Sequence, residues 1–120
     1  MKSREAQEQA IVVQWARMQE NRFEELKWIF HCPNGGSRNK IEAANLKRQG
    51  VKAGVPDLLL LAPKGEYIGL AIEMKYGKNK CTLEQIKWLD WLHKQGYMCK
   101  VCYGSEEAIE TIKQYLGIGD

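Results

Sequence analysis

The sequence predicts an α/β fold in which helices pack against a mixed β-sheet. Helix-like and strand-like segments follow one another along the 120 residues in the order α-β-α-β-β-α-β-α, and such an order implies a mixed sheet flanked by helices. Two apolar runs joined by a short turn indicate a β-hairpin in the middle of the chain. No repeat, low-complexity tract or linker interrupts this order, so we expect one domain over residues 1–120.

The N-terminal half supplies two helices and a strand. Residues 3–21 predict a helix capped by Ser3. Its helical stripe comprises Ala6, Ala10, Val13 and Arg17, with Val12 and Trp15 beside them. Residues 27–32 ("KWIFHC") favour a short strand, and the loop "PNGGSRN" follows. Residues 40–50 predict a second helix, which ends at Gly50.

The remaining elements carry their own start and stop signals. In order, we expect strands over 57–62 and 67–75 around the turn "PKGE", a helix over 81–96, a strand over 97–104 and a helix over 105–117. Thr82 and Ser105 are the predicted N-caps of the two helices. Gly96 and Gly117 are their predicted stops.

Composition and charge limit the possible functions. Hydrophobic residues make up 44% of the chain and charged residues 28%, which is ordinary for a globular protein. No run approaches the roughly 18 apolar residues of a membrane span. The polar start "MKSREAQEQ" lacks the apolar segment of a signal peptide, so we expect a cytoplasmic location. The net charge of +3 is compatible with binding nucleic acid.

The four cysteines do not predict a metal site. Only Cys99 and Cys102 are closely spaced, and they lie in a predicted strand. Residues three apart in a strand point to opposite faces, so these thiols cannot readily share a metal. We expect them to be buried apolar residues in a reducing compartment.

The central hairpin places charged residues inside the predicted sheet. If its turn is centred on Gly65, Asp57 lies opposite Glu73, and their Cβ atoms are about 4.5–5.5 Å apart. Lys75 shares that face, because it lies two residues beyond Glu73. A turn shifted by one residue would change this register. The spacing therefore predicts two carboxylates and an amine at one end of the hairpin.

A divalent cation would explain this cluster, because two carboxylates that close repel each other. Mg²⁺ and Mn²⁺ prefer oxygen ligands, and Mg²⁺ often takes one or two carboxylates together with water and substrate phosphates. Such a metal orients a water, lowers its pKa and neutralises charge on a phosphodiester. The structural alternative is that Asp57 caps a loop and Glu73 pairs with Lys75. Three such groups on one face favour the metal site.

These residues also carry a resemblance to a known family. Pro56, Asp57, Glu73 and Lys75 match the pattern of the PD-(D/E)XK nuclease superfamily. The stretches "HCPNGGSRNKIEAANLKRQGVKAGVPDLLLL", "GLAIEMK", "TLEQIKWLDWLHKQGY" and "EEAIETIKQYLG" resemble a stand-alone VRR-NUC domain, of the kind found in phages and bacteria. The similarity extends over nearly the whole chain.

The resemblance implies a restriction-endonuclease-like fold and a Mg²⁺- or Mn²⁺-dependent deoxyribonuclease. It implies a small homodimer that cuts branched DNA, as Holliday-junction resolvases do, in the host cytoplasm if the protein is phage-encoded. The alternatives are a nuclease directed at flaps or nicks and a non-catalytic DNA-binding module on the same fold. The complete cluster in the hairpin argues against the module, because binding alone does not require it.

The resemblance also implies further site residues. The family pattern begins with a helical Glu and a Gln four residues later, which Glu5 and Gln9 match. Glu5 would then join the two hairpin carboxylates as a metal ligand, with Glu8 as a competing candidate. The backbone carbonyl of Met74 would be another ligand, and Lys75 matches the catalytic lysine.

Gln85 has two interpretations, and the sequence supports both. It occupies the N3 position of a capping box that begins at Thr82. The resemblance places a glutamine close to the metal site at the same position, which makes Gln85 a catalytic candidate.

A basic surface is expected beside the cluster. Asn34, Gly35, Gly36 and Arg38 match a loop that family members share. Glycines let a backbone approach DNA closely, and a guanidinium suits a phosphate. Nearby basic residues are Lys40, Lys47, Arg48, Lys52, Lys78 and Lys80. Of these we expect Lys52 and Lys78 in particular to contact phosphates; a plain turn and solvated helix faces are the alternative.

The remaining large side chains are expected to pack. Residues predicted in the core are Trp88, Leu89, Trp91 and Leu92, with one tryptophan available to cover a partner subunit. The strand over 97–104, if it lies at the sheet edge, is a second candidate dimer interface. We expect His31 to be a hydrogen-bonded strand residue rather than a general base.

Overall fold

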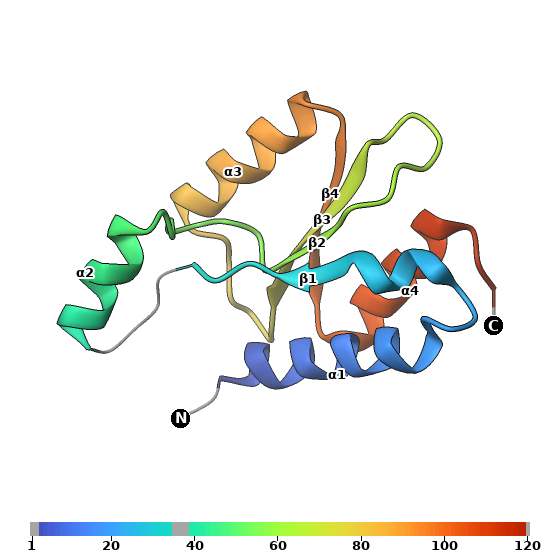
Figure 1. Ribbon diagram of the computed structural model, residues 1–120, viewed down its shortest axis with the longest axis horizontal. Helices are drawn as coiled ribbons and strands as arrows, with labels where there is room; N and C mark the ends of the chain where they lie inside the picture. The colour runs from blue at the N-terminus through green and yellow to red at the C-terminus, as the bar shows by residue number, and fades with distance from the viewer. Residues whose placement is uncertain (1–2, 35–38, 120) are drawn as a thin grey trace.

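The computed structural model describes residues 3–34 and 39–119 and confirms the predicted order of elements. The helices are α1 (Arg4–Gln19), α2 (Lys40–Arg48), α3 (Leu83–Lys94) and α4 (Ser105–Leu116), and the strands are β1 (Ile29–His31), β2 (Leu58–Leu60), β3 (Gly69–Lys75) and β4 (Tyr97–Tyr103) (Figure 1). A short 3₁₀ helix, η1 (Glu24–Trp28), precedes β1 and takes in Lys27 and Trp28, the first two residues of the strand predicted over residues 27–32.

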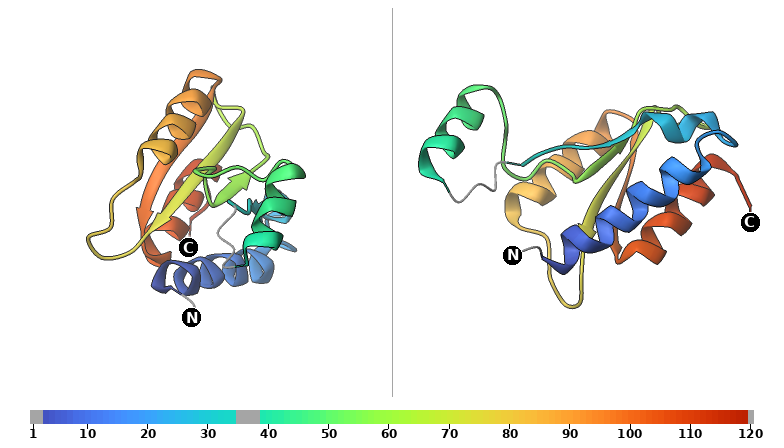
Figure 2. Two further views of the ribbon diagram at one scale, coloured as in Figure 1. Left: turned by 90° about the vertical axis from the view of Figure 1, so that its left-hand side faces the viewer. Right: turned by 60° about the horizontal axis from the view of Figure 1, so that its bottom comes forward.

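The four strands form a mixed sheet in the order β1-β2-β3-β4. The β1–β2 and β2–β3 pairs are antiparallel, and β3 and β4 are parallel. Helices α1 and α4 cover one face, and α3 lies over the other (Figures 1 and 2). The thiol of Cys102 contacts Thr111 of α4, whereas the thiol of Cys99 contacts the carbonyl of Leu89 in α3. The two cysteines therefore point to opposite faces, as predicted.

The hairpin register agrees with the prediction. Leu58 pairs with Ile72 and Leu60 with Leu70, so the register runs on to bring Asp57 opposite Glu73. Strand β2 begins only at Leu58, one residue later than predicted, and ends at Leu60.

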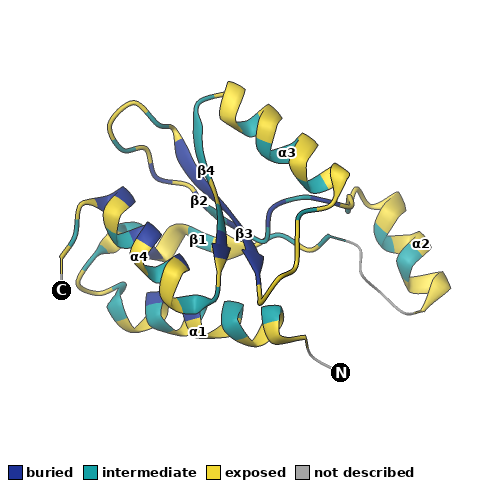
Figure 3. Ribbon diagram, turned by 180° about the vertical axis from the view of Figure 1, so that it is seen from behind, coloured by how far each residue is buried: buried dark blue, intermediate teal, exposed yellow. Residues whose placement is uncertain are grey.

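Strand β3 is the centre of the core, and all seven of its residues are buried (Figure 3). Leu70, Ile72 and Met74 pack with Val12 of α1 and Ile112 of α4 in the main hydrophobic cluster. A central strand covered on both faces is normally a continuous apolar run. Glu73 and Lys75 break that rule, and burying such groups is costly unless they have partners.

Helix α1 begins as predicted but faces the core differently. The Ser3 hydroxyl accepts a hydrogen bond from the Ala6 N–H. Val12 and Ala16 are the buried residues of α1, whereas Ala6 and Ala10 are exposed. The predicted stripe is therefore wrong, because Ala6, Ala10 and Arg17 are all exposed and the face toward the core runs through Val12 and Ala16 instead.

The predicted Ser105 cap is also wrong. Ser105 is the first residue of α4, and the N-cap is Gly104, which has no side chain to cap with. The Ser105 N–H donates instead to the Glu8 carboxylate of α1 over 2.8 Å. A residue from another helix thus satisfies an N–H that the helix itself leaves free. Gly117 ends α4 in the left-handed conformation, as predicted.

Helices α2 and α3 contain no fully buried residue. Trp88, Leu89 and Leu92 are half-buried, Trp91 is 60% exposed, and none of the four belongs to the main hydrophobic cluster of the described residues, so the core position predicted for them is wrong. Helix α2 stands away from the sheet in Figure 1 and in the right-hand view of Figure 2.

No helix in the described part of the chain has both the length and the apolar character of a membrane span.

Candidate metal-binding active site

Asp57 is held at the open end of the hairpin by three hydrogen bonds. Its Oδ2 accepts the Met74 N–H over 2.7 Å. Its carbonyl accepts the Cys32 N–H over 2.9 Å and the Nδ1–H of His31 over 2.8 Å. The Asp57 side chain thus accepts the Met74 N–H in place of a backbone carbonyl of the neighbouring strand. This explains why β2 starts after Asp57. His31 is a hydrogen-bonded strand residue, as predicted.

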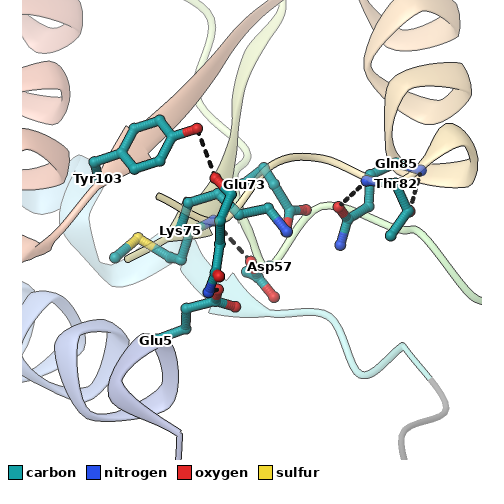
Figure 4. Close-up of polar contacts among 9 residues, drawn as sticks. Glu5, Asp57, Glu73, Lys75, Thr82, Gln85 and Tyr103 are labelled. Carbon is teal, nitrogen blue, oxygen red and sulfur yellow. Dashed lines mark hydrogen bonds and ion pairs between the residues drawn. The ribbon is translucent and has the colours of Figure 1, made fainter. Parts of the chain in front are cut away.

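The Glu73 carboxylate is buried with one oxygen unsatisfied. Glu73 is 2% exposed, and its Oε1 has no hydrogen-bond partner among the described residues. The other oxygen lies 3.7 Å from Lys75 Nζ, too far for a hydrogen bond (Figure 4). Burial raises the pKa of Glu73 to about 8, and the nearby Asp57 adds to this rise while Lys75 opposes it.

Glu5 and Glu8, the two candidates on α1, have different partners. Glu5 lies close enough to Glu73 to contribute to its raised pKa, and its Oε2 accepts a 2.6 Å hydrogen bond from Asn79 Nδ2. Glu8 binds the start of α4 through Ser105, and this hydrogen bond lowers the pKa of Glu8. Glu5 is therefore the α1 carboxylate that faces the hairpin cluster (Figure 4).

A pocket of about 220 Å³ adjoins these groups. It is lined by Ser3, Glu5, Ala6, Gln9, His31, Asn34, Asp57 and Met74. In an extended strand the N–H and C=O of one residue point to the same side. The Met74 N–H points at Asp57, so the Met74 carbonyl lies on the Asp57 side as well.

These residues fit a hard divalent cation without forming a closed cage. Within residues 3–34 and 39–119, no three His, Cys, Asp or Glu side chains are grouped closely enough to hold a metal by themselves. Mg²⁺ does not require such a group, because it keeps several waters and takes one or two carboxylates. The unsatisfied Glu73 oxygen beside Asp57 is the feature that a cation would complete.

Gln85 forms the predicted capping box. Its N–H donates to the Thr82 hydroxyl over 3.2 Å, and its Oε1 accepts the Thr82 N–H over 2.8 Å. Figure 4 shows the Gln85 side chain turned back onto Thr82 at the start of α3. Its catalytic role stays a prediction.

The predicted DNA-binding residues are only partly described. Gly35, Gly36 and Arg38 lie outside the described residues. Asn34 lines the pocket beside Asp57. Lys52 and Lys78 are exposed, in the loops that precede β2 and follow β3.

The sequence patterns did not identify two residues of this region, Asn79 and Tyr103. Asn79 holds Glu5, and its carbonyl accepts a 2.9 Å hydrogen bond from the Tyr103 hydroxyl. The segment "YGKNK" around Asn79 has the composition of an ordinary turn. Its partners lie far away in the sequence, so no local pattern could have identified it.

Comparisons with known proteins place the chain in a family. The sequence matches the family model of the VRR-NUC domain over residues 1–106. A solved structure of a VRR_NUC domain protein aligns with a TM-score of 0.79 and 35% sequence identity, covering 100% of this chain and 93% of that one. No curated protein sequence gives a match. The chain therefore belongs to the VRR-NUC domain family and has the nuclease-type α/β fold of that family.

Proposed function

We propose that this protein is an endonuclease that hydrolyses DNA phosphodiester bonds with Mg²⁺ or Mn²⁺. The supporting observation is the buried Glu73 carboxylate, which has an unsatisfied oxygen and lies beside Asp57. A purely structural ion pair should satisfy its buried atoms, whereas Lys75 lies 3.7 Å from Glu73. Membership of a family with a nuclease-type fold supports the same conclusion.

The residues divide into metal ligands and groups that act on the substrate. Asp57, Glu73, Glu5 and the Met74 carbonyl would hold the metal. The bound ion would supply a polarised water and positive charge at the phosphate. The hydrogen bond from Met74 keeps the Asp57 carboxylate in a fixed orientation.

Lys75 and Gln85 are the proposed catalytic side chains. Lys75 is buried next to Glu73, and its ammonium would stabilise charge on the phosphate in the transition state. The Gln85 Oε1 is occupied by the helix cap, which leaves the amide group as its available donor. Asn34, Lys52 and Lys78 would contact the DNA backbone.

We further propose branched DNA as the substrate and a homodimer as the active form. Cutting a four-way junction symmetrically takes two sites, which a two-fold dimer supplies. Ile86 and Trp91 on α3 are 52% and 60% exposed, and exposed apolar surface of this kind marks interaction sites. Strand β4 lies at one edge of the sheet. This is the condition under which the strand was expected to be a second candidate dimer interface.

A substrate panel tests this proposal. Purified protein is incubated with Mg²⁺ or Mn²⁺ and with labelled linear, nicked, flapped and four-way DNA. Preferential cutting of the four-way junction supports the proposal, and preferential cutting of flaps or nicks favours the alternative nuclease. Tight binding to DNA without cutting under any of these conditions would identify a non-catalytic module.

A further inference from the structure

A second and larger pocket lies between the end of α2 and the start of α3, with a volume of about 640 Å³. Pockets that bind small molecules typically have volumes of about 300–1,000 Å³. The Trp88 ring and Val51 contribute apolar surface to it, and Lys47, Lys52 and Glu84 contribute charged groups. None of these five side chains belongs to the proposed metal site, and of the five only Lys52 is among the DNA contacts proposed above.

Hydrogen bonds and close packing hold the backbone around this pocket. The Val51 N–H donates to the Leu46 carbonyl and the Gly50 N–H to the Lys47 carbonyl, a Schellman closure that ties the loop to the end of α2. Gly54 is buried with φ +87°, and a Cβ at this position would lie 2.8 Å from the Glu84 backbone. The loop from α2 therefore rests directly on the first turn of α3.

The charge of the pocket favours an anionic ligand. Lys47 and Lys52 are exposed, and neither forms an ion pair with the residues that the structure describes. The Glu84 carboxylate is 3.6 Å from the Lys87 ammonium, which offsets its negative charge. An aromatic wall beside two available ammonium groups suits a nucleotide, because a base stacks on the ring and its phosphates pair with the cations.

Asn34 connects this pocket to the proposed metal site, because it lines both. A nucleotide in the larger pocket would be a near neighbour of a phosphate at Asp57. A base inside a duplex is already stacked and paired, so only an unpaired base can enter such a pocket without a cost of a few kcal/mol.

We propose that the pocket between α2 and α3 binds one unpaired nucleobase of the strand that is cut, stacked on Trp88, with the flanking phosphates at Lys47 and Lys52. This inference rests on the proposed nuclease function. It identifies a feature by which the site distinguishes a fork or flap, which supplies an unpaired base, from a continuous duplex. At a four-way junction, whose bases are all paired, one base pair next to the branch point has to open before the base can enter.

The test is a double-substitution cycle on DNA affinity, measured in EDTA so that no cutting occurs. One forked duplex carries normal bases next to its branch point, and a second carries abasic residues there. Trp88→Leu should weaken binding to the first fork roughly 5- to 150-fold, the range for loss of one stacked base, and leave binding to the abasic fork unchanged. Trp88→Phe should restore most of the affinity, because it keeps an aromatic face.

Trp28→Leu is the matched control, because Trp28 is 56% exposed on η1 and lines none of the pockets described above. It should bind both forks like the wild type. An equal loss on the two forks for Trp88→Leu, or an equal loss for Trp28→Leu, would overturn the base pocket. If the cycle gives the expected result but Mg²⁺ produces no cutting, the pocket stands and the nuclease proposal fails. If Mg²⁺-dependent cutting occurs but Trp88→Leu changes neither affinity, the pocket alone fails.

Discussion

The side-chain amide of Asn79 donates a 2.6 Å hydrogen bond to the Glu5 carboxylate. This contact joins the loop after β3 to the first turn of α1, across most of the sequence. The Tyr103 hydroxyl holds the same loop through the Asn79 carbonyl. Glu5 is thereby positioned beside the hairpin carboxylates by residues that do not belong to the family motif.

Asn79→Ala should weaken metal binding about 10- to 100-fold, the usual effect of removing a hydrogen-bond partner of a metal ligand. Isothermal titration of the DNA-free protein with Mn²⁺ measures this affinity. Tyr103→Phe should give a smaller loss, because it removes only the support of the loop. Asn45→Ala in α2 is the control, since the side chain of Asn45 accepts a hydrogen bond from Arg48 and lies in another part of the fold. Unchanged affinity in Asn79→Ala would remove Glu5 from the ligand set.

Glu8→Ala should lower stability and leave metal binding intact, because Glu8 caps α4 rather than facing the hairpin. The expected loss is about 0.5–1 kcal/mol, the lower part of the range for an N-cap, since this carboxylate is partly exposed. Urea unfolding measures the loss, and Gln14→Ala is a control at an exposed position of the same helix. A large fall in Mn²⁺ affinity would instead show that Glu8 is a metal ligand.

Much of the hairpin could be predicted because its information is local. The turn at Gly65 and the alternation of apolar and charged residues determine the register that brings Asp57 and Glu73 together. The Ser3 and Thr82 caps are also local, since each side chain bonds within three residues. These features follow from short-range sequence patterns.

The contacts that were missed are all long-range. Serine is a common N-cap residue, but the N–H of Ser105 donates to the carboxylate of Glu8, 97 positions away in the sequence. Asn79 reaches Glu5 across 74 positions. Such contacts depend on how α1 packs beside α4 and the end of the sheet, which one sequence does not show.

The stability of the metal-free protein should fall as the pH rises from about 4.5 to about 8. Glu73 has an ordinary pKa of 4.5 and a pKa of about 8 in the fold. Over this interval the folded state holds a proton that the unfolded chain has released, so raising the pH favours unfolding.

Glu73→Gln removes this titrating group and should flatten the pH dependence. Urea unfolding in EDTA at pH 5 and pH 9 compares the two proteins. The difference between the two pH values should be larger for the wild type. Parallel behaviour of the two proteins would show that burial does not hold a proton on Glu73.

Ile86→Glu should convert the proposed dimer into a folded monomer. Ile86 is 52% exposed on α3, so a charge there costs little in the monomer but much in a dimer interface. Sedimentation equilibrium at micromolar concentration gives the mass, and circular dichroism checks the fold. A wild-type mass near the 13.8 kDa of one chain, with and without DNA, would contradict the dimer.

The central claim is that Glu73 and Asp57 hold a metal that is required for cutting DNA. Its most direct test is the single-turnover cleavage rate of a four-way junction by the wild type and by Glu73→Gln, in Mg²⁺ and in excess EDTA. The wild type should cut in Mg²⁺, stop in EDTA and recover when Mg²⁺ is restored, and Glu73→Gln should be about 100-fold slower or worse while remaining folded. Cutting in excess EDTA, or cutting by Glu73→Gln at the wild-type rate, would contradict the claim.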